Sequence, residues 1–126
     1  MSDIRAGTIS DAAGTGPITL TGQSASKAWV TFKGTATQAI EGSQYVSSLV
    51  DNGTGDYTIN FTSSFSSINY AYAGMGGKNT TSQVCVTQPR NLSAPTVSSI
   101  RHQTLIADTS LADARVASIT YHGDLA

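Results

Sequence analysis

The sequence has little charge, a single cysteine and no long apolar run, and each shortage argues against a class of protein. Only 12% of the 126 residues are charged, and seven basic against eight acidic side chains leave a net charge of −1. That balance provides no basic surface of the kind that binds nucleic acid. One cysteine excludes an internal disulfide, and the alternation of Val84-Cys85-Val86 predicts a buried small apolar residue rather than a reactive thiol.

The sequence also offers no segment for a membrane. No apolar run approaches the roughly 20 residues that a membrane-spanning helix needs. Residues 1–16 are polar and rich in glycine, which is not typical of a secretory signal peptide. We therefore expect a protein that is made in a cytoplasm and is not inserted into a membrane.

What the sequence does contain favours strands and turns, because serine, threonine and glycine are abundant. The clearest pattern is at residues 56–62, where Tyr57, Ile59 and Phe61 alternate with polar residues as in a half-buried strand. The preceding residues are Asp51-Asn52-Gly53-Thr54-Gly55-Asp56, a run of turn-forming types. We therefore expect a hairpin of strands 44–50 and 56–62, joined by a turn at 51–56.

Other short alternating segments predict further strands, at 28–35, 69–75, 83–88, 96–105 and 115–121. Segments 36–43, anchored by Ile40, and 74–81 are expected to be loops. No convincing amphipathic helix is present. Many short strands separated by turns predict an all-β fold, namely an antiparallel β-sandwich with a jelly-roll-like arrangement.

The length fits one domain, which we place at 27–126 after a short extended N-terminal attachment arm at 1–26. In its first strand, Trp29 and Thr31 face one side, whereas Val30 and Phe32 face the other. Because each side carries a large apolar residue, both faces are expected to be covered, as in a sandwich or a subunit contact.

The candidate surface contacts are Tyr70, Tyr72, Met75, Lys78 and Asn79. The glycine-rich run that contains Met75 and Lys78 invites comparison with a phosphate-binding loop, but Tyr72 and Asn79 stand where that motif needs glycine and serine or threonine. We therefore interpret the run as a surface loop that can contact a partner. Tyr70 and Tyr72 could stack on sugars, although aromatic residues at strand spacing more often form a core or a subunit interface.

Neither a metal site nor a catalytic site is expected, and no cofactor is implied. The turn at 51–56 carries two carboxylates, but glycines stand where a helical calcium loop needs oxygen ligands, so a structural turn is favoured over a weak calcium site. His102 and His122 have no partners at ligand spacing. A hydrolase nucleophile motif is absent, and Glu41 is the only glutamate, so glycosidase chemistry would depend on aspartate pairs that the sequence does not bring together.

Several segments resemble a domain of tailed bacteriophages, the C-terminal domain of tail-fibre-like and other virion structural proteins. They are Lys-Ala-Trp-Val-Thr-Phe-Lys-Gly-Thr at 27–35, the run 46–61 and Asn-Tyr-Ala at 69–71. The resemblance covers roughly 27–123 and is strongest at 45–62. The start, 1–5 followed by 13–16, also looks like the N-terminus of short phage fibre proteins.

The resemblance implies a non-enzymatic virion component, often trimeric, on the surface of the particle. The leading expectation is a short tail fibre or baseplate adhesin that contacts the host surface, with surface glycan as a candidate partner, and binds other virion proteins through the arm. The alternative is a capsid decoration protein that clamps head subunits. An enzyme acting on cell-surface glycan ranks last, because no pair of acidic residues is evident.

Overall fold

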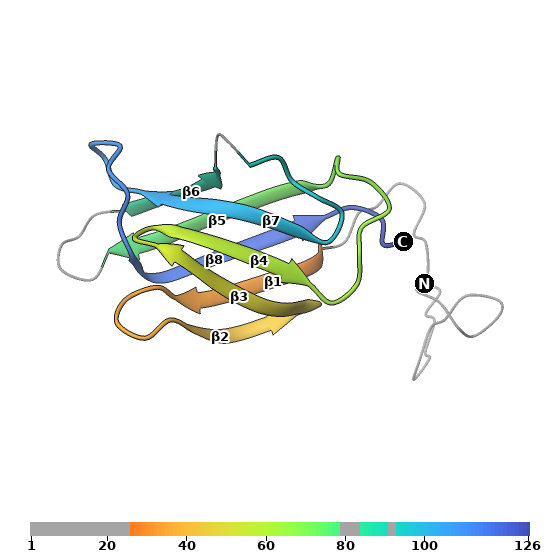
Figure 1. The fold of residues 1–126 in the computed structure, drawn as a ribbon, viewed down its shortest axis with the longest axis horizontal. Helices are drawn as coiled ribbons and strands as arrows, with labels where there is room; N and C mark the ends of the chain where they lie inside the picture. Colours follow the sequence, from red (N-terminus) through yellow and green to blue (C-terminus); the bar gives the residue numbers. More distant parts are fainter. Residues whose placement is uncertain (1–25, 79–83, 91–92) are drawn as a thin grey trace, which may run out of the picture.

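The computed structural model describes residues 26–78, 84–90 and 93–126, which form eight strands and, within these ranges, no helix (Figure 1). Each strand pairs antiparallel with its neighbours. The strands are β1 (Ser26–Lys33), β2 (Ala39–Gln44), β3 (Val46–Gly53), β4 (Asp56–Phe61), β5 (Ala71–Lys78), β6 (Val84–Pro89), β7 (Ser99–Leu105) and β8 (Ala114–His122). The predicted all-β antiparallel class is confirmed. The predicted arm lies outside the described residues, except for Ser26 at the start of β1.

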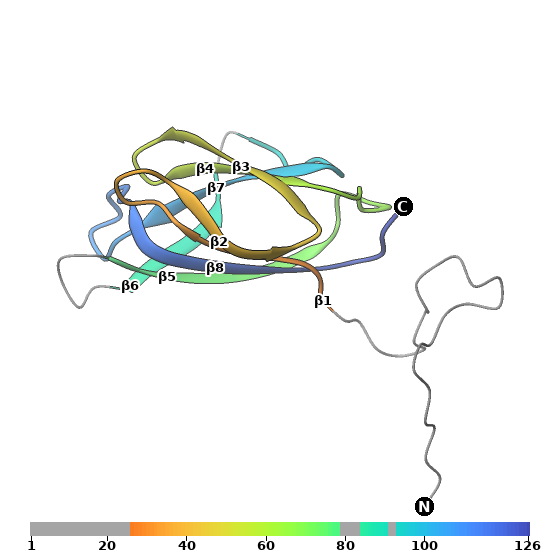
Figure 2. The ribbon, with the colours of Figure 1, turned by 90° about the horizontal axis from the view of Figure 1, so that it is seen from below.

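The eight strands belong to one continuous sheet in the order β2-β1-β8-β5-β6-β7-β4-β3. Figure 2 shows that this sheet curls over, so that β3, β4 and β7 lie opposite β1, β8 and β5. Its two edge strands come close to each other, and the Gln38 side-chain amide bridges them by donating to the Leu49 carbonyl at 3.0 Å. The sheet is therefore nearly closed, and the finer expectation of two separate packed sheets is not confirmed.

The strand order contains two overlapping Greek keys. Strands β5, β6 and β7 are consecutive neighbours, and β8 returns to lie beside β5. This is the spatial order 4-1-2-3 that defines the motif. Strand β4 lies on the other side of the same three strands, beside β7, so that connections cross both ends of the sheet.

The predicted hairpin is present as β3 and β4, with a shorter turn than expected. Gly53 pairs with Asp56, so only Thr54 and Gly55 lie between the paired residues. Gly55 has a φ of +63°, and a Cβ there would lie 2.7 Å from the Ala112 nitrogen. The position therefore requires glycine both for its backbone angle and for its close contact.

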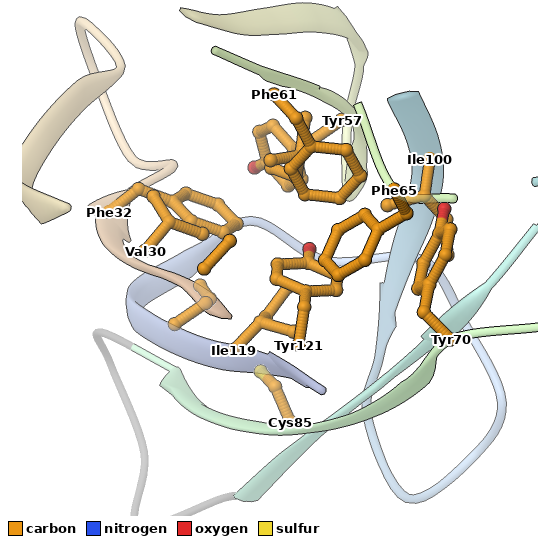
Figure 3. Close-up of a cluster of buried hydrophobic side chains, with 14 residues drawn as sticks. Val30, Phe32, Tyr57, Phe61, Phe65, Tyr70, Cys85, Ile100, Ile119 and Tyr121 are labelled. Atoms are coloured by element: carbon orange, nitrogen blue, oxygen red, sulfur yellow. The ribbon is translucent and has the colours of Figure 1, made fainter. Parts of the chain in front are cut away.

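The core lies inside the curled sheet and consists of the inward residues that alternation predicted. Tyr57 and Ile59 of β4 are fully buried, and Phe61 at its end is nearly so. Figure 3 shows the rings of Phe61, Phe65, Tyr70 and Tyr121 close together, with Phe32 on the other side of the cluster. The Phe61 ring packs edge-on against Phe65, Tyr70 and Tyr121, at centroid distances of 5.0, 5.7 and 4.9 Å. Burial of Cys85 is also confirmed.

Two segments expected to be loops are strands. Segment 36–43 contains most of β2, and Ile40 is exposed rather than an anchor. The sequence at 74–78 continues β5, because its glycines allow the strand to lie close against β8. A Cβ on Gly74 would lie 2.8 Å from Ile119 Cγ1, and one on Gly76 would lie 2.9 Å from the Val116 carbonyl. Residues 79–81 of the expected loop lie outside the described residues.

These contacts predict that alanine is tolerated at Gly77 but not at the adjacent Gly76. Replacing Gly76 by alanine should lower the free energy of unfolding by about 1–3 kcal/mol, because the new methyl group has no room against β8. The matched control is Gly77→Ala, where a Cβ meets nothing within 4 Å. Urea unfolding of both variants measures the difference, and equal stabilities would contradict the close packing of β5 on β8.

Candidate functional site

The outward side of β5, β6 and β8 carries an exposed apolar cluster, which we call the apolar patch: Met75, Val84, Val86 and Val116. Met75 pairs with Val86, and Gly77 pairs with Val84 on one side and Val116 on the other. Met75 is 67% exposed, Val84 56% and Val86 55%. Strand register thus brings together apolar side chains from three strands on one outward surface.

The apolar patch continues into a wider uncharged surface, the outer face, made by the outward residues of β1, β8, β5 and β6. Ser118 pairs with Met75 on β5 and with Thr31 on β1, and the two hydroxyl oxygens of Ser118 and Thr31 lie 3.0 Å apart. Trp29 covers Gly42 of β2, and its indole N–H donates to Gln44 Oε1 at 3.2 Å. The outer face consists of Trp29, Thr31, Ala73, Met75, Gly77, Val84, Val86, Val116, Ser118 and Thr120.

The predicted surface contacts do not form one surface. Tyr70 is a correction: it is 6% exposed, stacks on Phe65 at 4.4 Å between centroids, and donates its hydroxyl hydrogen to the Thr96 carbonyl. Tyr72 is partly exposed, and its ring meets the His102 ring edge-on. Met75 lies in the apolar patch, Lys78 ends β5, and Asn79 lies outside the described residues.

Sequence reasoning missed most of the apolar patch. Alternation around Cys85 already placed Val84 and Val86 on the face opposite the core. The same holds for Val116 against Ala117. What the sequence did not provide was the pairing that sets these valines beside Met75, because that register joins strands distant in the chain.

The carboxylate of Asp56, which the turn analysis weighed as a calcium ligand, is held by two arginines. Arg101 donates from Nε to Asp56 Oδ1 at 2.7 Å and from Nη2 to Oδ2 at 2.8 Å. Arg90 Nη1 lies 2.9 Å from Oδ2. The hydrogen bonds from Arg101 hold the pKa of Asp56 below its usual value, against the effect of burial. Within the described residues no group of three or more potential metal ligands occurs.

A second carboxylate organises the same end of the sheet. Asp113 Oδ1 accepts hydrogen bonds from the Gly55 backbone N–H and from the Tyr57 hydroxyl, both at 2.8 Å. Burial and this bond raise the pKa of Tyr57 above its usual value. Both carboxylates are thus occupied in joining strands and turns.

His102 is a buried core residue. Its Nε2 lies 3.0 Å from the Tyr121 hydroxyl oxygen, and neither side chain is exposed. Burial lowers the pKa of His102 to about 4, so the imidazole is neutral near neutral pH. His102 therefore belongs to the core, whereas the outer face is open to a partner.

Comparison with known proteins adds no relative to this picture: no protein family, curated protein or solved structure matches the chain. The described part of the chain holds no helix that is long and apolar enough to cross a membrane.

The buried histidine predicts a specific dependence of stability on pH. The unfolded chain takes up a proton at His102 near pH 6.5, whereas the folded protein does so only near pH 4. Stability should therefore be complete above pH 6.5 and fall between 6.5 and 4, by up to about 3 kcal/mol. Below pH 4 both states are protonated, and this contribution changes no further.

Urea unfolding at a series of pH values tests this expectation. His102→Gln should remove most of the slope between pH 6.5 and 4, and His122→Gln, at the other histidine, should retain it. An unchanged slope in His102→Gln would show that other groups cause the pH dependence.

Proposed function

We propose that the protein is a non-enzymatic bacteriophage virion structural protein, a short tail fibre or baseplate adhesin that contacts the host surface. It acts as a homotrimer and attaches to other virion proteins through residues 1–26. The sequence resemblance supports the phage origin and the trimer.

The observation that carries the proposal is the role of the block with the strongest resemblance. Residues 45–62 form the β3–β4 hairpin, whose inward side chains fill the core and whose Asp56 is fixed by two arginines. The residues that carry the resemblance thus include residues that hold the sheet together. A rigid scaffold that presents surface loops suits a protein that binds a receptor.

The direction of β1 suggests which end contacts the host. Ser26 pairs with His122, so the arm joins the sheet at the end that carries the C-terminus. If the arm attaches to the particle, the opposite end faces outward. That end holds the β1–β2 and β3–β4 turns and the connection 106–113, which is rich in exposed polar residues.

An open depression at this outward end offers polar contacts. Lys33, Glu41 and Arg115 line it, together with Thr35, Ala36 and Val116. Cationic and hydroxyl groups of this kind bind the oxygen atoms of surface polysaccharide. The same geometry would serve the alternative, a decoration protein on the capsid lattice, so location on the particle separates the two.

Antibody-gold labelling of intact virions tests the proposed location. Label at the tail tip or baseplate is the expected result. Label spread over the head would replace the adhesin by a capsid decoration protein. Absence of label from every particle, with antibody that binds the purified chain, would reject the virion role altogether.

The outward depression predicts a loss of host binding. Substituting Lys33 and Arg115 together by alanine should weaken binding of the purified protein to host cells about tenfold, equivalent to about 1.4 kcal/mol. Flow cytometry with labelled protein measures the binding. The matched control is Lys27→Ala, near the opposite end of β1. Equal binding by all the proteins would remove this end from the contact.

A further inference from the structure

The outer face is unusual for a protein surface because it is both apolar and free of charge at its centre. The three most exposed residues of the apolar patch, Met75, Val84 and Val86, are adjacent on β5 and β6. Contiguous exposed apolar surface of this kind marks an interface in soluble proteins. The charged side chains nearest to it, Lys33 and Arg115, lie at strand ends.

This distribution matches the anatomy of a protein–protein interface. Interface centres are depleted in charged residues and enriched in aromatic residues and methionine, with polar groups at the rim. Met75 and Trp29 lie on the outer face, and the charges form its margin. The small residues Ala73 and Gly77 flank Met75 on β5 and leave space beside its side chain, which a facing sheet about 10 Å away can fill.

We propose that the outer face is the contact between copies of this chain. The centre of the face carries no charge with which to select a different partner, whereas a second copy presents a surface of the same apolar chemistry. The hydroxyl groups of Thr31 and Ser118 bond to each other, so they need no partner from outside.

The available area is sufficient for this contact. Trp29 extends the outer face over β2, which makes five adjacent strands. Five strands about 4.8 Å apart and about eight residues long at about 3.3 Å each give a face of about 600 Å². Two such faces together bury about 1,200 Å², which reaches the lower limit of about 1,200 Å² for stable specific interfaces.

This inference goes beyond the proposed function and does not depend on a phage origin. Contact of one face with the same face of a second copy joins copies in pairs, whereas the trimer of the proposed function comes from the resemblance. Gold labelling measures the proposed location on a particle, and light scattering of the purified chain measures the contact between copies. The location and the contact can therefore fail independently.

The test is the mass of the full chain by size-exclusion chromatography with light scattering. The native chain should elute as an oligomer, and Met75→Lys should reduce its mass to that of the monomer, because the contact would bury an unpaired charge. The matched control is Ile68→Lys, at a 54% exposed apolar residue in the β4–β5 connection, which should remain oligomeric. Circular dichroism establishes that both variants are folded.

Trp29 provides a second measurement, because it is the only tryptophan and lies on the outer face. Its emission should shift to longer wavelength in Met75→Lys and on dilution of the native chain, as the indole becomes exposed to water. It should not shift in Ile68→Lys. A native chain that is monomeric at every concentration, or a Met75→Lys variant that keeps the oligomer, would overturn the proposal.

Discussion

The rest of the structure depends on the neutralisation of one buried carboxylate. Asp56 is 5% exposed at the start of β4, directly before the fully buried Tyr57. An unpaired carboxylate there would oppose folding strongly, since burial of an isolated charge is costly. Arg101 of β7 and Arg90 after β6 both reach it, so three separate segments must be in place together. Each arginine side chain is about one-third exposed, so the solvent weakens its attraction to Asp56. The geometry of the two ion pairs is nevertheless preserved.

A second carboxylate completes the arrangement around the same turn. Asp113, from the connection between β7 and β8, accepts hydrogen bonds from Gly55 and Tyr57. The β3–β4 hairpin is therefore attached both to its sheet neighbour and to a segment that crosses the end of the sheet. This explains why the turn at 51–56 is structural although it is rich in carboxylates, because its acidic groups are engaged in contacts within the protein.

The parts of the fold that could be predicted from sequence are those whose pattern is local. Alternation grouped Tyr57, Ile59 and Phe61 on one face of a half-buried strand, and these three are buried in the structure. Strand β2 escaped prediction because most of its residues are exposed on both faces, so no alternation exists to detect. The first part of β5 falls within the predicted strand 69–75, but residues 76–78 were expected to be a loop because of their glycines, whereas Gly76 permits close contact with β8.

The candidate site depends on register between distant strands, which local patterns do not encode. Tyr70 illustrates the same limit, since only the folded connection between β4 and β5 brings its ring onto Phe65. Whether a residue near the end of a strand is exposed depends on the path of the connection that joins this strand to the next. Alternation indicated that each valine of the apolar patch lies on the face opposite the core. It did not indicate that these valines lie beside Met75.

The position of β8 between β1 and β5 constrains the order in which the strands can pair during folding. Val30 of β1 pairs with Ile119 of β8, so the first described strand has no partner on that side until β8 has been synthesised. Contacts of such long sequence separation form slowly, because a large loop must close before they contribute. On a ribosome, β5, β6 and β7 can associate as neighbours while β1 waits. Strand β8 therefore joins β1 to β5, and a chain cut short before β8 leaves the edges of β1 and β5 unpaired and open to other chains.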